Sequence, residues 1–184
     1  MKRAALAVAW PVGLLLAASA ALASPPPPAV RDALPQAQLR GEATLRIFGF
    51  ALYDARLWAL PAFDAGRYAE QPFVLELQYR RAIAAETIAE RSILEMRRLQ
   101  GVDEARALAW RTALLQALRD VRPGDRLGAL HLPGRPVRFY FNDQHTAAID
   151  DTAFARPFFG IWLAEATRDT ALRDALLGRA AGRP

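Results

Sequence analysis

The regular alternation of apolar and polar residues from Phe73 to Arg80 constrains the fold of this chain most strongly. Apolar side chains occupy every second position from Phe73 to Tyr79, and polar side chains take most of the positions between them, namely Glu76, Gln78 and Arg80. A period of two is that of a β-strand with one buried face. Such a strand needs partner strands and a layer of other elements over its apolar face.

Other stretches predict the partner strands. From Glu42 to Trp58 the sequence reads as one strand-like stretch, in which Gly49 indicates a bulge or a bend. Pro61 to Pro72 reads as a loop. Three short strands are predicted after residue 125, connected by the turn residues Pro133-Gly134 and Asn142-Asp143-Gln144; they span Leu127 to Leu132, Val137 to Asn142 and His145 to Ile149.

Helical spacing predicts the covering layer. A stripe from Ala85 to Leu99 predicts a helix that ends at Gly101, and a second helix runs from about Asp103 to Val121. Two more helices follow the last strand, one carrying Phe154, Phe158, Ile161 and Trp162, the other starting near Asp169 or Thr170 and ending at Gly178. This order of elements predicts an α+β domain with an antiparallel sheet.

The first residues have the pattern of a cleaved signal peptide. Lys2 and Arg3 precede an apolar run, and Ala21-Leu22-Ala23 offers small residues for cleavage before Ser24. A membrane anchor is the less favoured alternative, because Pro11 and Gly13 interrupt a run already near the lower length limit for a span. We therefore expect a signal peptide over 1–23, a proline-rich leader over 24–38 that is extended from Ser24 to Pro28, and a single domain over 39–180, located in the periplasm or secreted.

Composition removes several classes of function. The chain carries a net charge of +5, which falls to +3 without Lys2 and Arg3, so we do not expect nucleic acid as a partner. After Ala23 the chain has no lysine, its serines are Ser24 and Ser92, and it has no cysteine at all. The two histidines lack metal-ligand spacing, and neither a phosphate loop nor a dinucleotide fingerprint is present. No cofactor and no metal site are expected.

A few residues are candidates for a site. Arg46 and Arg80 lie at strand positions near aromatic residues and could receive an acidic ligand, with Tyr53 and Tyr79 as further ligand-binding candidates. For Arg80-Arg81 we favour the structural reading, in which one arginine is solvated and the other is paired with a glutamate. Other polar or aromatic residues have a structural reading that we favour: Asp150 or Asp151 as a helix cap, His131 and His145 as structural histidines, Tyr140 and Asn142 as surface residues, and Trp110, Phe158, Phe159 and Trp162 as core.

Three stretches together resemble a known family. They are Leu45 to Trp58, Leu77 to Arg81 with the helix after it, and Phe154 to Leu163 continuing to Leu176-Leu177-Gly178. The set is similar to the exported bacterial proteins of the chalcone isomerase-like family, over about Leu39 to Gly178. The resemblance implies an open-faced sandwich, in which helices cover one face of a large antiparallel sheet. It also implies a ligand cleft between sheet and helices, where plant enzymes close a flavanone ring and plastid relatives bind fatty acids.

The catalytic residues implied by that resemblance are mostly missing. The plant enzymes use an arginine and a threonine on early strands, then a tyrosine and an asparagine on the helical segment. Here Ile83 to Val121 contains neither tyrosine nor asparagine, and Phe48 stands where the threonine is expected. We therefore expect a non-catalytic domain that binds an apolar or amphipathic acid. The alternatives are an isomerase or lyase that uses Tyr53, Tyr79 or Arg80, and an assembly factor without a ligand.

Overall fold

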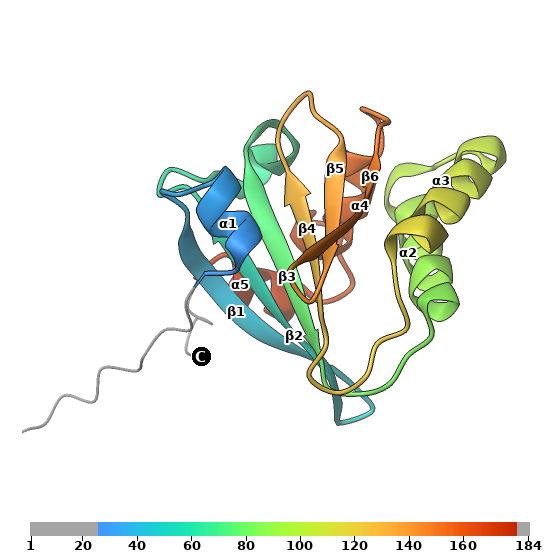
Figure 1. Ribbon diagram of the computed structural model, residues 1–184, viewed down its shortest axis with the longest axis horizontal. Helices are drawn as coiled ribbons and strands as arrows, with labels where there is room; N and C mark the ends of the chain where they lie inside the picture. Colours follow the sequence, from blue (N-terminus) through green and yellow to red (C-terminus); the bar gives the residue numbers. More distant parts are fainter. Residues whose placement is uncertain (1–25, 180–184) are drawn as a thin grey trace, which may run out of the picture.

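Six antiparallel strands form one sheet in the computed structural model, which describes residues 26–179 (Figure 1). Each strand pairs with the next along the chain, so the sheet order is the sequence order. The sheet is therefore a meander, in which two helices are inserted between the third and the fourth strand. The strands are β1 (Gln38–Ile47), β2 (Phe50–Ala59), β3 (Phe73–Tyr79), β4 (Arg126–His131), β5 (Val137–Phe141) and β6 (Gln144–Ile149).

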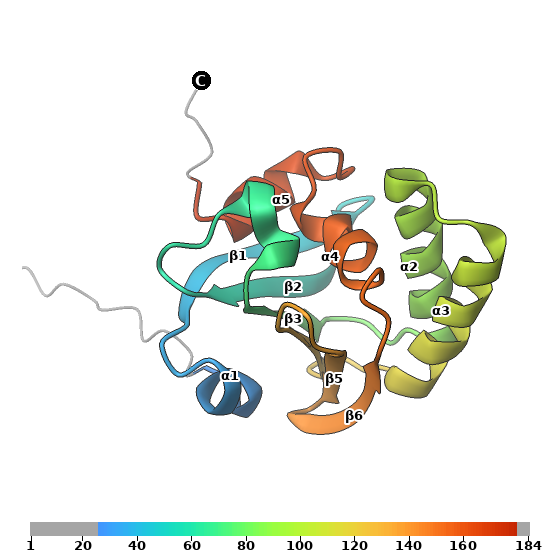
Figure 2. The same ribbon diagram turned by 90° about the horizontal axis from the view of Figure 1, so that it is seen from above.

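The larger helices lie on one face of this sheet, which we call the inner face (Figure 2). In chain order they are α2 (Ala85–Gln100), α3 (Glu104–Ala117), α4 (Ala155–Leu163) and α5 (Thr170–Leu176), with the short 3₁₀ helix η1 (Ala65–Glu70) beside α4. The predicted open-faced α+β sandwich is thus confirmed. No helix within residues 26–179 is both long and apolar enough to cross a membrane.

The core lies between the inner face and these helices. Phe73, Leu75 and Leu77 of β3 point into it, as the alternation predicts, and α4 packs Phe158 and Phe159 against them. Phe73 and Phe159 are both fully buried, with ring centroids 4.6 Å apart. Burial of each such side chain contributes about 1.5–3 kcal/mol, so the alternation of β3 fixes which face the helices cover.

The stretch from Glu42 to Trp58 forms two strands, so the expectation of one bent strand was wrong. β1 and β2 make a hairpin in which Ile47 pairs with Phe50, and Phe48 and Gly49 form the two-residue turn. Both turn residues have positive φ, 50° for Phe48 and 82° for Gly49. The usual sequence of such a turn is Asn-Gly or Asp-Gly, and an aromatic residue in its first position gave no turn signal.

The proline-rich leader continues into a helix that the sequence analysis did not predict. Residues Pro28–Ala33 form this short helix, α1. This helix packs Val30 and Leu34 onto Trp58, Val74 and Leu130 of the other sheet face, which we call the outer face (Figure 2). The four consecutive prolines concealed this helix, although proline is well tolerated in a first helical turn. The signal-peptide prediction lies outside the described residues.

Helix ends agree with most of the predicted signals. Gly101 ends α2 in the left-handed conformation, and the carboxylates of Asp103 and Asp169 accept hydrogen bonds from backbone N–H groups in the first turns of α3 and α5. Asp151 lies further from α4 than a capping residue. Its carboxylate accepts from the Ala153 backbone N–H and from the Trp110 indole N–H, and so ties α3 to the turn before α4.

Candidate functional site

Two tyrosines of the inner face lie side by side at one end of the sheet. Tyr53 of β2 and Tyr79 of β3 are direct partners in the strand register, and their rings make an edge-to-face contact at 5.6 Å. Both side chains are buried. We call Tyr53 and Tyr79 the tyrosine pair, and we call the end of the sheet where β3 finishes and β1 turns into β2 the hairpin end.

The hydroxyl groups of the tyrosine pair are under-used in hydrogen bonding. The Trp162 indole N–H donates to the Tyr53 hydroxyl oxygen over 2.9 Å, which leaves the Tyr53 O–H free to donate. The Tyr79 hydroxyl forms no hydrogen bond with another residue between 26 and 179, but it is not among the fully buried polar atoms of that range without a partner, which are Arg40 Nε, Trp58 Nε1 and His131 Nδ1. Two phenol O–H donors that are not used within residues 26–179 thus lie side by side, which suggests a role beyond packing.

Burial controls the ionisation of both hydroxyls. It raises the pKa of Tyr53 to about 12, although the hydrogen bond from Trp162 opposes the shift. Burial also raises the pKa of Tyr79, and the neighbouring Tyr53 adds to the effect. Both groups therefore stay protonated at neutral pH, which makes them hydrogen-bond donors and poor general bases.

The layer around the tyrosine pair is apolar. Trp162 and Phe158 of α4 lie over it, with their rings in edge-to-face contact at 5.5 Å. Around these buried groups, Leu52, Ile83 and Ile88 are only half-buried. Since the layer is filled by side chains, a ligand would have to displace some of them, and the half-buried residues near the hairpin end are the easiest to move.

The two arginines proposed for the site lie elsewhere. Arg80 follows Tyr79 directly, so its side chain takes the opposite side of the strand, where Nε donates to the Asp54 carboxylate at 2.8 Å. Arg46 is exposed near the hairpin turn, 3.5 Å from the Gly49 carbonyl oxygen. The structure thus brings together Tyr53 and Tyr79 but not Arg46 and Arg80.

Trp162 was expected to be a core residue. Its hydrogen bond to Tyr53 joins residues 109 positions apart in the sequence, a contact that no local pattern reveals.

Charged side chains run across the outer face as a ladder. Arg56 of β2 contacts Glu42 on one side and Glu76 on the other, and Arg126 of β4 approaches Glu76 from the far side at 3.5 Å. Burial raises the pKa of Glu76, and the two arginines oppose that shift. Every charge of this ladder has a partner of opposite sign, so these charged side chains need no ligand to balance them.

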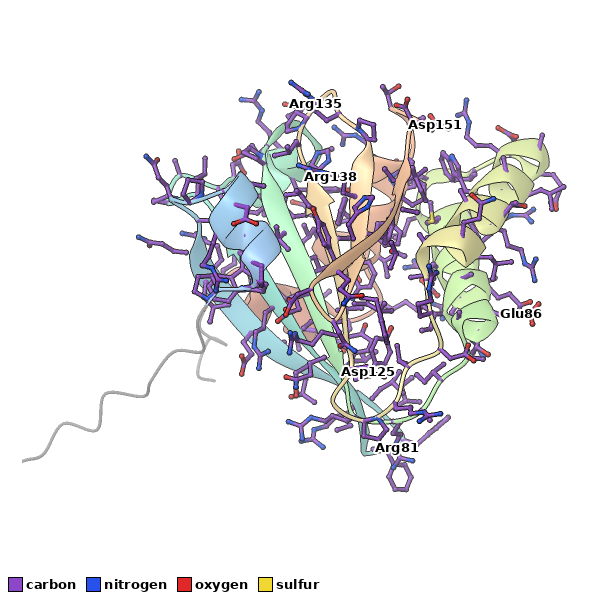
Figure 3. The ribbon with its side chains drawn as sticks, in the orientation of Figure 1. Arg81, Glu86, Asp125, Arg135, Arg138 and Asp151 are labelled. Carbon is purple, nitrogen blue, oxygen red and sulfur yellow. The ribbon has the colours of Figure 1, made fainter. Side chains whose placement is uncertain are left out.

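Two hollows of the structure lie away from the tyrosine pair. One, of about 200 Å³, is lined in part by His131, Arg135 and Asp151 at the opposite end of the sheet (Figure 3). Its His131 ring is buried against Phe73 and Phe159 and lies 2.8 Å from the Ala69 carbonyl oxygen, as expected for a structural histidine. Burial lowers the pKa of His131. The other hollow, of about 230 Å³, separates α1 from Tyr140 on the outer face.

Phe48 and Asn142, two positions that the resemblance singled out, lie at hairpin turns. Phe48, at the expected threonine position, is 96% exposed at the hairpin turn. Asn142 is at the turn between β5 and β6, where its side chain bonds the Arg126 backbone N–H and the Asp125 carboxylate. In the part of the chain that the structure describes, no three His, Asp or Glu side chains are grouped to hold a metal ion.

Comparison with known proteins agrees with this architecture. The chain is similar in fold to a crystal structure of the fatty-acid binding protein AtFAP1 of Arabidopsis thaliana, with a TM-score of 0.59 and 11% sequence identity over 78% of this chain and 87% of that one. At this identity the likeness concerns the fold. No curated protein matches the sequence. The family model described as chalcone isomerase-like, however, matches residues 33–178, which include all six strands and the four large helices. By its sequence and its sheet-and-helix architecture, the chain belongs to the chalcone isomerase-like family.

Proposed function

We propose that this protein is an exported, non-catalytic carrier that binds an apolar acid, such as a fatty or phenolic acid, between the inner face and α4. The tyrosine pair receives the acid group, and the surrounding apolar layer receives its tail. The similarity in fold to a fatty-acid binding protein supports the ligand class. The observation that carries the proposal is the contact of two buried tyrosine rings whose protonated hydroxyls have O–H donors that are not used within residues 26–179.

The chemistry of the tyrosine pair suits a carboxyl group. A carboxylate has two oxygens and accepts several hydrogen bonds, while each tyrosine offers one donor that stays protonated. Hydrogen bonds to a charged group contribute about 1.5–3 kcal/mol each, which offsets part of the cost of removing the carboxylate from water. The Arg80 side chain lies on the outer face, paired with Asp54, so it does not share this role in the described conformation.

Calorimetric titration with a long-chain fatty acid below its micelle concentration tests the proposal. Tyr79→Phe keeps the ring but removes the donor, so the Kd should rise by about 10- to 100-fold. Because the Tyr79 hydroxyl has no partner among residues 26–179, the same change should leave the melting temperature unchanged or slightly higher.

Tyr140→Phe is the matched control, since Tyr140 lies half-buried on the outer face beside α1. This variant should bind the acid as the wild type does. If Tyr79→Phe and Tyr140→Phe both bind with wild-type affinity, the acid group is not received by the tyrosine pair.

A ligand-free assembly factor is the second candidate function. The filled layer between α4 and the sheet favours it, together with the apolar side chains exposed at the hairpin turn. Uniform absence of binding across a panel of fatty and phenolic acids would favour this second candidate over the first.

Export rests on the signal-peptide pattern of 1–23 and on the resemblance to exported bacterial members of the family. The sequence around Ala23 leads us to propose a mature N-terminus at Ser24 and a location in the periplasm or outside the cell. N-terminal sequencing of protein recovered from that compartment should begin at Ser24. An intact Met1 in that material would contradict export by cleavage.

A further inference from the structure

The turn between β1 and β2 carries a cluster of exposed apolar side chains. Among residues 26–179, five large apolar side chains are exposed, and three of them, Ile47, Phe48 and Phe50, lie at this one turn. We call these three residues the tip. Phe48 is 96% exposed and Phe50 62%. Three neighbouring apolar residues at the end of a hairpin are more than the scattered exposed side chains of an ordinary surface.

Folding alone does not explain Phe48. Its φ of 50° lies in the left-handed region, which aromatic residues seldom adopt. The β5–β6 hairpin makes the same kind of two-residue turn with Asn142 and Asp143, at φ of 47° and 70°. Asn and Asp are the residues that such turns favour. The chain thus uses typical turn residues at one hairpin and a strained, fully exposed phenylalanine at the other.

Positive charge surrounds the tip. The Arg81 guanidinium stacks over the Phe50 ring at 4.7 Å, and Figure 3 places Arg81 at the end of the molecule where β1 turns into β2. Arg46 is the residue before Ile47, and Arg122 is exposed in the turn whose Gly124 N–H bonds the Tyr79 carbonyl. Neither Arg46, Arg81 nor Arg122 forms an ion pair with any residue between 26 and 179.

The carboxylates at this end are already engaged. Asp54 is bound by Thr44 and Arg80. Asp120 accepts from the Ala85 backbone N–H, and Asp125 accepts from the Arg122 backbone N–H and from Asn142. The hairpin end therefore combines exposed aromatic rings with three arginines whose guanidinium groups form no ion pair within residues 26–179, although the charge of Arg122 also acts on the Asp125 carboxylate.

We propose that the tip docks on an anionic lipid surface, with the phenylalanine rings among the acyl chains and the arginines at the lipid phosphates. Aromatic and aliphatic side chains gain free energy by entering the membrane interface, and basic residues around them are attracted to anionic headgroups. A protein partner would also cover apolar residues, but the three unpaired arginines around a small convex tip match a phosphate surface better. This inference does not depend on ligand binding between α4 and the sheet.

Sedimentation with vesicles tests this docking, using full-length mature protein and no added ligand. The protein should sediment with vesicles of phosphatidylglycerol and much less with vesicles of phosphatidylcholine. Phe48→Asn should weaken the partition by about tenfold or more, because it removes the most exposed ring. The same substitution installs the favoured Asn-Gly turn, so the melting temperature should stay the same or rise. Arg46→Gln with Arg81→Gln should also weaken binding to the anionic vesicles.

Two matched controls lie outside the hairpin end. Leu108→Ala removes an exposed leucine of α3, and Arg135→Gln removes an exposed arginine at the opposite end of the molecule (Figure 3). Both variants should bind the vesicles as the wild type does. Equal binding by wild type and Phe48→Asn would overturn the proposal. A second result would also overturn it: a wild-type protein that does not bind vesicles but self-associates, with Phe48→Asn abolishing the self-association. The tip would then belong to an interface between two copies.

Discussion

Asp54 shows how single residues of the outer face depend on their partners. Its carboxylate accepts from the Thr44 hydroxyl at 2.7 Å and from the Arg80 guanidinium at 2.8 Å. Burial by itself would raise the pKa of Asp54, but these two bonds and the charges of Arg80 and Arg56 hold it below its usual 3.8. The ionised form of Asp54 is therefore more favourable in the folded protein than in the unfolded chain.

Asp54→Asn should lower the free energy of unfolding at pH 7 by about 1–2 kcal/mol, with the exposure of Arg80 reducing the value. A depressed folded pKa stabilises the protein fully above about 3.8, and this contribution is lost as the pH falls through the folded value. The difference between wild type and variant should thus shrink below pH 3.8 in denaturant titrations. Arg80→Gln completes a double-mutant cycle, and purely additive effects of the two changes would contradict the coupling.

At the scale of elements, β1 and α5 meet more closely than a side chain would permit. A Cβ at Gly41 would lie 2.0 Å from the Ala175 carbonyl oxygen and 2.6 Å from the Leu176 carbonyl oxygen. Both are backbone atoms, so no side-chain rotation relieves the overlap. The absence of a side chain at Gly41 allows α5 to rest on the edge strand and complete the helical layer.

Gly41→Ala should therefore destabilise the protein by about 1–3 kcal/mol or more, since β1 and α5 would have to separate. Gly128→Ala is the control within the same sheet, because its Cβ would meet only the Tyr140 Cβ at 3.6 Å. Thermal unfolding of the two variants should show a loss for Gly41→Ala and little change for Gly128→Ala. Equal melting temperatures would mean that α5 is not held against β1 as the structure shows.

The sequence predicted the elements whose burial is regular. β3 and the last three strands were predicted to within two residues, because helices bury one face of the sheet and the apolar side chains alternate accordingly. The β1–β2 turn was missed because Phe48 is not a residue that such turns favour. The alternation of the strand could have predicted that Tyr79 and Arg80 do not share a site, because consecutive residues of an extended chain face opposite sides of the sheet. The contact of Tyr53 with Trp162 depends on tertiary packing that local patterns do not encode.

At the scale of the whole molecule, the hairpin end gathers the features that point to function. The tyrosine pair ends the inner face there, and the tip and its arginines lie just beyond it. Leu52, Ile83 and Ile88 are half-buried residues packed against the core. An acid taken from an anionic membrane at the tip would have a short path to the tyrosine pair, although docking and binding are separate properties that separate variants remove.

Carbon NMR of a fatty acid labelled at its carboxyl carbon tests acid binding at the tyrosine pair most directly. We predict a protein-bound carboxyl resonance that is distinct from the resonance of the free acid. Its chemical shift should not change as the pH is varied around the pKa of the free acid. The resonance should shift in Tyr79→Phe but not in Tyr140→Phe. The Phe48→Asn variant should retain this resonance, because the tip is not part of the binding layer. A spectrum with only the free-acid resonance, or a bound resonance that is identical in wild type and Tyr79→Phe, would contradict the account.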